Sequence, residues 1–278
     1  MVTDNQARPE RITDNYTTVT EIPGLHASMQ QIQMLYERYR FALQFCEDKQ
    51  VLEVGCGAGM GLPYLAGKAH RVVGGDYTEN VLRLSKKNHG GRIPLLRLDA
   101  QTLPFRDRSF DVIILYEAIY YLSSAAQFLR ESHRVLREKG VLLICSVNKE
   151  CRDFHPSPFS VCYYSANELL RLLRAHSFQV EIFGGFPTEN DSSWGKLFVS
   201  ILKRMAITLH LMPRTMKGKE FLKHIFFGKL VPLPVEVKDG MAKPSLPIPL
   251  AVNGSDLYYK IIYAVAHPKE LFPEQNRV

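Results

Sequence analysis

The fold is decided by the stretch Val51-Leu-Glu-Val-Gly-Cys-Gly-Ala-Gly-Met-Gly61, which is followed by Arg71-Val-Val-Gly-Gly-Asp76. In both segments an apolar run ends at small or acidic residues, which is the pattern of a strand that stops at a tight turn. Glycines in such a turn take positive φ and let a ligand approach the backbone. An acid about 20 residues further on accepts hydrogen bonds from ribose hydroxyls. The stretch therefore predicts a loop that holds a nucleoside-containing cofactor.

The glycine spacing distinguishes two kinds of cofactor. A dinucleotide fingerprint reads G-x-G-x-x-G, and its third glycine would fall at the position of Met60. The chain instead reads E-x-G-x-G-x-G from Glu53 to Gly59. This pattern resembles motif I of the class I S-adenosylmethionine (SAM)-dependent methyltransferases. A nicotinamide-dependent oxidoreductase is the less favoured interpretation of the loop.

Two segments further along the chain resemble the same family. Leu103-Pro-Phe105 with Ser109-Phe-Asp111 is similar to its "LPF…SFD" stretch. His133-Arg-Val-Leu-Arg-Glu-Lys-Gly140 is similar to its "RVLKPGG" segment, with Glu138 in place of the usual proline. The resemblance covers residues 45–185 and a last strand near the C-terminus. It implies an α/β fold, a doubly wound, Rossmann-like sheet of seven strands with strand seven antiparallel.

The resemblance also implies the cofactor, SAM, and the residues that hold it. Asp76 is expected at the ribose hydroxyls and Asp99 at the adenine amino group, with help from the backbone of Ala100. Tyr116 and Glu117 follow the fourth strand, where the reacting methyl group is expected, because open α/β sheets bind ligands at the carboxyl ends of their strands. The expected cofactor-binding set is Glu53, Gly55, Cys56, Gly57, Gly59, Asp76, Tyr77, Asp99, Ala100 and Tyr116.

Hydrophobic periodicity predicts the remaining elements. Ser165 and Glu168 have the spacing of a capping box at the start of a helix. An apolar stripe predicts a long N-terminal helix, which in related methyltransferases covers the cofactor. The expected helices are 27–47, 128–138 (ending at Lys139-Gly140) and 168–176, and the expected strands are 51–54, 71–76, 95–99, 111–116, 141–147, 179–183 (closed by Gly184-Gly185) and 257–266.

The wide gap between the last two expected strands predicts an insertion, which we expect to cap the substrate site. Two helices, 195–212 and 216–228, are expected in it, followed by a proline-rich stretch. The predicted organisation is an arm and lid helix (1–47), a SAM-binding core (48–186), the inserted cap (187–254), and a final strand with a tail (255–278).

The chain has 278 residues and a net charge of +7, and its basic residues gather between Lys196 and Leu230. Three explanations stay open: a solvated helix face, a site for an anionic acceptor, and contact with an anionic membrane surface. No signal region and no uninterrupted apolar span are expected, since Lys203 and Arg204 break the longest candidate. Five cysteines without a C-x-x-C pair indicate a cytoplasmic protein with no zinc site.

The sequence carries less information about the residues that bind the methyl acceptor. His155 is the favoured general base and Glu117 the second candidate, while Tyr120, Tyr121, Tyr163 and Tyr164 are candidate walls of the acceptor pocket. We expect transfer to an oxygen, or a nitrogen, of a small or medium acceptor such as a glycan precursor or specialised metabolite. The loop after strand four lacks the [N/D]-P-P-[Y/F] motif of enzymes that methylate amino groups of DNA bases or glutamine. Nucleic acid is disfavoured because no RNA-binding module is recognisable and the basic segment lacks interleaved stacking aromatics. A non-catalytic SAM-binding protein remains the alternative, and no pattern indicates the oligomeric state.

Overall fold

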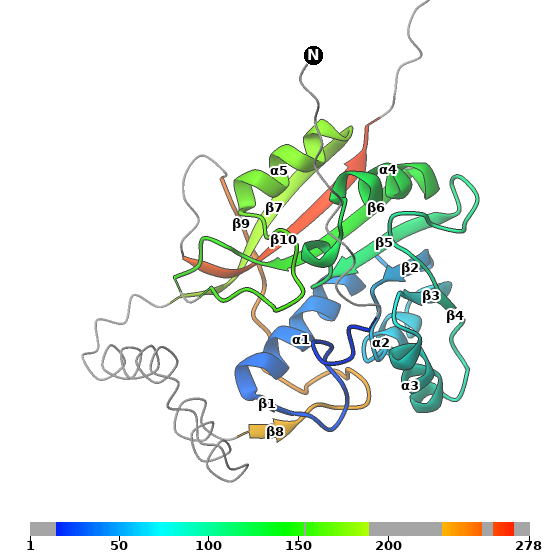
Figure 1. Ribbon diagram of the computed structural model, residues 1–278, viewed down its shortest axis with the longest axis vertical. Helices are drawn as coiled ribbons and strands as arrows, with labels where there is room; N and C mark the ends of the chain where they lie inside the picture. The colour runs from blue at the N-terminus through cyan, green and yellow to red at the C-terminus, as the bar shows by residue number, and fades with distance from the viewer. Residues whose placement is uncertain (1–14, 153, 189–229, 252–257, 270–278) are drawn as a thin grey trace, which may run out of the picture.

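The central sheet has eight strands in the order β4–β3–β2–β5–β6–β10–β7–β9 (Figure 1). This computed structural model describes residues 15–152, 154–188, 230–251 and 258–269. Strands β4 to β6 pair in parallel, whereas β10 is antiparallel to both β6 and β7. The strands are β2 Gln50–Val54, β3 Arg71–Asp76, β4 Leu95–Arg97, β5 Phe110–Tyr116, β6 Leu136–Val147, β7 Phe178–Pro187, β9 Ile248–Pro249 and β10 Tyr259–Pro268.

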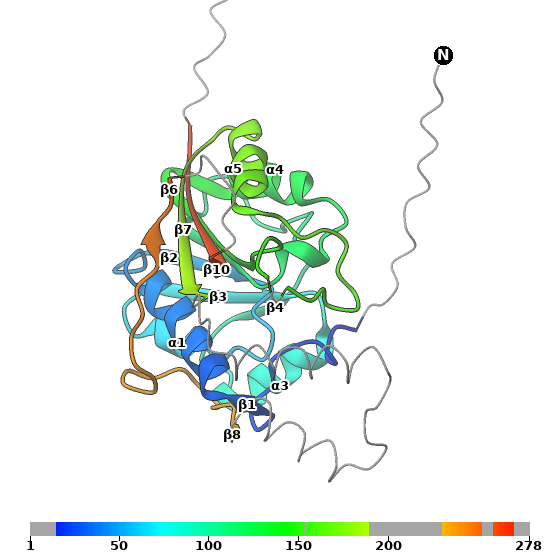
Figure 2. The same cartoon turned by 90° about the vertical axis from the view of Figure 1, so that its left-hand side faces the viewer.

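Helices cover both faces of this sheet (Figures 1 and 2). Alternate residues of a strand point to opposite faces. Val112 and Ile114 of β5 therefore pack in the cluster with α1 and α2, and Ile113 and Leu115 pack in the cluster with α4 and α5. Burial on both faces explains why β5 is one continuous apolar run. The helices are α1 Met29–Leu43, α2 Leu62–Ala66, α3 Glu79–His89, the 3-10 turn η1 Ile119–Tyr121, α4 Ala125–Val135 and α5 Ala166–Ala175.

The expected doubly wound architecture is confirmed, including the antiparallel last strand. The sheet has one strand more than the expected seven, because β9 pairs with the outer edge of β7. Pro249 fits this place, since an edge strand leaves one side of its backbone unpaired. A separate two-stranded sheet joins β1 (His26–Ser28) to β8 (Leu230–Pro232).

The helix expected over 128–138 ends three residues early. Leu136 has extended backbone (φ −73°, ψ 143°) and pairs with Phe110 of β5. Lys139 and Gly140, which were expected to end the helix, lie inside β6 instead. Leu136 is 2% exposed. Burial and strand pairing at this position override the helix propensity of the residues that follow it.

The expected sixth strand also runs further than its sequence suggests, because Gly184 and Gly185 do not close it. A Cβ atom on Gly184 would lie 2.5 Å from the ring of Tyr259 on the neighbouring strand β10. The glycine therefore makes room for an aromatic ring across the sheet, which single-sequence periodicity does not distinguish from a turn.

The capping box at the start of α5 is confirmed. Ser165 accepts a hydrogen bond from the backbone N–H of Glu168, whose carboxylate accepts one from the N–H of Ser165. Both helices expected in the insertion fall in residues 189–229, outside the described ranges. Within those ranges, no helix has the length and hydropathy needed to cross a membrane.

Candidate active site

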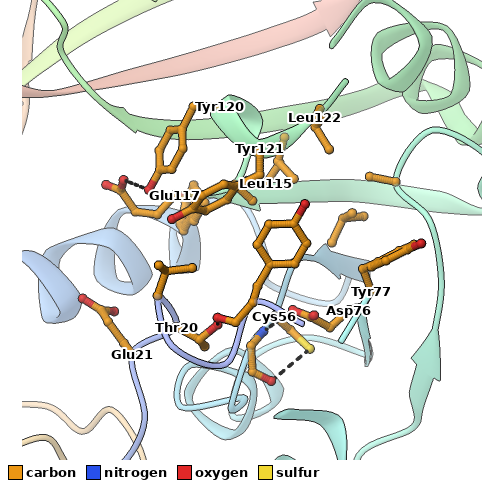
Figure 3. Close-up of a pocket in the computed structure, with 18 of the residues that line it drawn as sticks. Thr20, Glu21, Cys56, Asp76, Tyr77, Leu115, Glu117, Tyr120, Tyr121 and Leu122 are labelled. Atoms are coloured by element: carbon orange, nitrogen blue, oxygen red, sulfur yellow. Dashed lines mark hydrogen bonds between the residues drawn. The ribbon is translucent and has the colours of Figure 1, made fainter. Parts of the chain in front are cut away.

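A cavity of about 430 Å³ opens at the carboxyl ends of β2, β3 and β5 (Figure 3). Its walls come from the glycine loop, the ends of these strands, helix α1 and the loop around Phe159. The part of the N-terminal arm that is described, residues 15–25, adds a further wall through Tyr16, Val19, Thr20 and Glu21. The cavity lies where an open α/β sheet is expected to bind its ligand.

The glycine loop has the backbone conformation that its sequence predicts. Gly55, Gly57 and Gly59 have φ of 72°, 54° and 73°. A Cβ atom on Gly59 would lie 2.1 Å from Oγ of Ser85 on α3, so no side chain fits there. The N–H groups of Gly55 and Cys56 donate to the carbonyl of Gly75 at 2.7 and 3.0 Å, which ties the loop to β3. Gly55, Cys56 and Gly57 all line the cavity.

Asp76 lies at the end of β3 and faces the cavity. One carboxylate oxygen accepts the N–H of Gly57 and the other accepts the N–H of Thr78, both at 2.8 Å. Burial raises the pKa of this carboxyl, while these hydrogen bonds lower it. Each oxygen has a second lone pair, so the same carboxylate can also accept from two ribose hydroxyls. Tyr77 lines the cavity beside it.

Asp99 and Ala100 line the cavity at the next strand end, as the sequence predicts. The Asp99 carboxylate also has a local task, because it accepts the backbone N–H of Gln101 at 2.9 Å. Gln101 in turn accepts from the N–H of Ser124, the residue that caps α4. The turn that presents the expected adenine contact is therefore fixed by its own side chains.

Glu53 does not line the cavity, although the resemblance places it among the cofactor-binding residues. It is 1% exposed and accepts a hydrogen bond of 2.7 Å from the hydroxyl of Tyr39 on α1. Burial raises the pKa of Glu53 to about 8. The Tyr39 ring occupies the space that a Cβ on Gly61 would need. Tyr39 itself lines the cavity, so this hydrogen bond connects Glu53 to the cavity wall.

Glu117 follows β5 in a left-handed backbone conformation, with φ of 51°. Such a conformation is uncommon for a residue with a side chain and is often found at functional sites. The N–H of Glu117 donates to the carbonyl of Cys145 at 2.8 Å, and its carboxylate accepts from the hydroxyl of Tyr120 at 3.0 Å (Figure 3). The side chain is partly buried in the cavity wall, and burial raises its pKa. Tyr116 lines the wall next to it.

Of the four candidate acceptor tyrosines, Tyr120 and Tyr121 line the cavity and the other two do not. Tyr163 lies behind the wall, where its ring stacks on Tyr120 with centroids 4.3 Å apart. Tyr164 is half-buried away from the cavity. His155 is exposed and is not among the residues that line the cavity. Phe159 and Val161, from the same loop, line it instead.

Sequence reasoning missed the arm as a wall of the site. Tyr16 donates its N–H to the hydroxyl of Thr78 at 3.2 Å, and its ring lies 5.2 Å from that of Tyr121 and 6.3 Å from that of Phe159. Glu21 forms an ion pair with Arg38 of α1, a buried arginine that also lines the cavity. The arm shows no hydrophobic periodicity, so its sequence does not predict that it packs against the site.

Residues 230–245 of the insertion, which we call the clasp segment, form hydrogen bonds with the arm, with the glycine loop and with α2. Leu233 exchanges backbone hydrogen bonds with Gly24 and Leu25 of the arm, at 2.9 and 2.8 Å. Val237 donates to the carbonyl of Met60, and Asp239 accepts from Tyr64 of α2 at 2.6 Å. None of the described residues 230–251 lines the cavity. The cap role expected for 187–254 therefore stays a prediction for the residues that are not described.

The residues present fit a nucleoside. Two carboxylates at neighbouring strand ends, Asp76 and Asp99, suit a ribose and an adenine amino group. The loop has no side chain between its backbone and the cavity at Gly55 and Gly57, so a ligand can approach the chain closely.

Comparison with known proteins agrees with this geometry. Residues 52–144 match the family described as "Methyltransferase domain". A probable S-adenosylmethionine-dependent methyltransferase of Mycolicibacterium smegmatis is 34% identical over 167 residues, which are 58% of this chain and 63% of that protein. A phthiotriol/phenolphthiotriol dimycocerosates methyltransferase of Mycobacterium tuberculosis is 43% identical over 97 residues, 33% of this chain and 35% of that protein. The chain thus spans less than two thirds of the length of these relatives.

Solved structures support the fold. The YcgJ protein of Bacillus subtilis superposes with a TM-score of 0.54 at 18% identity, over 84% of this chain and 98% of that one. A putative methyltransferase of Haloferax volcanii, solved with the Trm112 methyltransferase activator, gives a TM-score of 0.56 at 16% identity, over 87% of this chain and 93% of that one. At these identities the likeness shows the architecture alone.

Proposed function

We propose that this chain, whose residues 52–144 form a class I SAM-dependent methyltransferase domain, moves the methyl group of SAM to a hydroxyl oxygen of a largely apolar acceptor. The observation that carries the proposal is one continuous cavity, which joins the glycine loop and Asp76 to the carboxylate of Glu117. Candidate cofactor-binding groups and a candidate base therefore share one cavity.

SAM, when bound, supplies a methyl group on a positively charged sulfur, which leaves with the electron pair of the broken carbon–sulfur bond. The residues of the chain have two tasks beside this donor. The glycine loop, Asp76 and Asp99 hold and orient the cofactor, and the aromatic wall of Tyr16, Tyr121 and Phe159 keeps water out.

Glu117 is the residue we favour as general base. A hydroxyl acceptor must lose its proton as its oxygen forms the new bond to the methyl carbon, and that proton passes to the Glu117 carboxylate. Burial raises the pKa of this carboxyl, which makes the carboxylate a stronger base than an exposed one. His155, the base favoured by sequence, is exposed outside the cavity, so we place it second.

Apolar side chains in the cavity lining support an apolar acceptor. They include Met34 and Leu35 of α1, with Val147, Phe159 and Ile261, and they stand beside the charged Glu21 and Arg38. A bare sugar would leave most of its hydroxyls against these side chains without hydrogen-bond partners, which is costly. The relative from Mycobacterium tuberculosis is named for phthiotriol and phenolphthiotriol dimycocerosates, and this name agrees with a hydroxyl on an apolar molecule. An anionic acceptor, membrane contact and a cytoplasmic location remain predictions of the sequence.

The test is transfer of radiolabelled methyl from SAM to four sets of acceptors: long-chain secondary alcohols, alkylphenols, monosaccharides and alkylamines. We expect label in the alcohols or phenols. Label only in sugars or amines would reject the proposed acceptor class. Micromolar binding of S-adenosylhomocysteine without transfer to any set would favour the non-catalytic alternative.

Glu117→Gln tests the base within the same assay. We expect kcat to fall by about 10²- to 10⁴-fold, the usual contribution of general-base catalysis, with the Kd of S-adenosylhomocysteine unchanged. His155→Ala is the matched control and should keep kcat. If His155→Ala loses activity and Glu117→Gln keeps it, the roles of the two residues are reversed.

A further inference from the structure

Glu117 shares its side of the cavity with two other charged residues, and the mechanism above does not use them. Arg38 comes from α1 and Glu21 from the arm, and both line the cavity. Figure 3 shows Glu21 on the same side as Glu117, away from Asp76 and Tyr77. The three charges come from segments that are far apart in the sequence, so their meeting is a product of the fold.

Arg38 interacts electrostatically with three carboxylates, those of Glu21, Glu117 and Glu53, and forms an ion pair with Glu21. Its Nη2 lies 2.5 Å from the carboxylate of Glu21. Among the described residues, Glu117 has no ion pair to Arg38, and its hydrogen bonds come from Tyr120 and Cys145. Arg38 is 7% exposed, so water screens its charge poorly. Burial raises the pKa of Glu53 to about 8, so that carboxyl is protonated near neutral pH, and it already accepts from Tyr39. A buried guanidinium released by Glu21 would therefore turn to Glu117.

Glu21 is held in place by the position of the arm. On one side Tyr16 is anchored to Thr78, and on the other Gly24 is anchored to Leu233 of the clasp segment. The Glu21 side chain itself is 41% exposed, so it lies at the surface and is not part of the buried core. The ion pair therefore forms only while the arm lies over the cavity.

We propose that Glu21 is a positioning residue that holds Arg38 away from Glu117, so that Glu117 becomes a competent base only when the arm covers the site. With the arm displaced, Arg38 pairs with Glu117 and weakens it as a base. With the arm in place, Glu21 takes the guanidinium and leaves the Glu117 carboxylate to the acceptor hydroxyl. This inference rests on the proposed function, because it assigns Glu117 a proton to accept.

The electrostatics of Glu117 have the signs that this arrangement requires. Burial is the largest cause that raises its pKa, Arg38 lowers the pKa, and Glu21 raises it. Other titratable groups face Glu117 from the surrounding elements and are common to both arm positions. They are Tyr120 and Tyr121 of the η1 turn, Cys145 of β6, Tyr163 of the following loop and Tyr263 of β10.

The experiment is a titration of Glu117 in the full chain without cofactor. Glutamate is labelled with ¹³C at Cδ, and the signal lost in Glu117→Gln identifies the residue. Glu21→Gln should lower the titration midpoint of Glu117 by about one pH unit, since it removes a negative neighbour and frees Arg38. Glu79→Gln, which removes an exposed carboxylate paired to Arg83 on α3, is the control and should change nothing.

A midpoint that Glu21→Gln leaves unchanged, or raises, overturns the proposal. Arg38→Gln provides a second test with the opposite sign, because loss of the guanidinium should raise the midpoint; an unchanged or lowered midpoint overturns it as well. These outcomes are separate from the test of the base. Glu117→Gln without loss of turnover rejects Glu117 as base and leaves the titration valid, whereas an unmoved midpoint rejects only the role of Glu21.

Discussion

Glu53→Gln should make the protein more stable at alkaline pH, although it changes a buried residue of the cofactor motif. Burial raises the pKa of Glu53 from 4.5 to about 8. Between these two values the folded protein keeps a proton that the unfolded chain has released. The free energy of unfolding therefore falls as the pH rises through this interval, and Glu53 contributes least to stability above pH 8.

The size of the effect follows from the same two values. At about 1.4 kcal/mol for each pH unit, the interval corresponds to at most about 5 kcal/mol. Glutamine keeps an oxygen that can accept from the Tyr39 hydroxyl and has no proton to lose. Its amide NH₂ lies where Oε2 of Glu53 has no hydrogen-bond partner among the described residues, which costs about 1–3 kcal/mol at every pH.

The assay is urea denaturation of the wild-type and Glu53→Gln proteins without cofactor, at intervals from pH 5 to pH 9. The variant should be less stable by up to about 2 kcal/mol at pH 5 and more stable by about 2–4 kcal/mol at pH 9. Glu79→Gln, which changes an exposed carboxylate, is the control for the pH dependence of the rest of the chain. A difference between wild type and Glu53→Gln that stays constant with pH would refute the reasoning.

Two further changes address the cofactor side. Asp76→Asn should weaken binding of S-adenosylhomocysteine by about 1–3 kcal/mol in calorimetry, because the amide replaces one acceptor oxygen by a donor; a Kd within about twofold of wild type would remove the residue from the ribose site. Gly59→Ala should lower the melting temperature much more than Gly90→Ala, since both glycines have positive φ but only the first would place its Cβ against Ser85, and equal losses would contradict this difference.

Short sequence motifs were sufficient to predict the part of the site that lies at the strand ends of the sheet. The glycine loop and Asp76 lie within one short stretch of the sequence. The side chains at the ends of these strands lie at the same edge of the sheet and line the cavity. Glu117 could be singled out because it directly follows a buried strand. Its left-handed backbone had no signal, since the residue is not a glycine.

The walls made by distant segments were not predictable in the same way. Glu21 and Arg38 meet because the arm is fastened to Leu233, a contact that no local pattern encodes. His155 looked like a base from its neighbours in sequence, yet its loop turns Phe159 and Val161 to the cavity. Glu53 was expected to bind the cofactor, but its carboxylate accepts a hydrogen bond from Tyr39 of α1.

The position of β10 has a consequence for how the chain acquires its structure. Val147 of β6 pairs with Ile261, and Gly185 of β7 pairs with the same residue from the other side, so β10 fills a gap between two strands made long before it. During synthesis β6 and β7 therefore expose unpaired edges until residues 259–268 have left the ribosome. Such edges invite association with other chains, and pairing across so long a separation is slow. Because β10 pairs with both strands, residues 259–268 cover two sheet edges at once when they join the sheet.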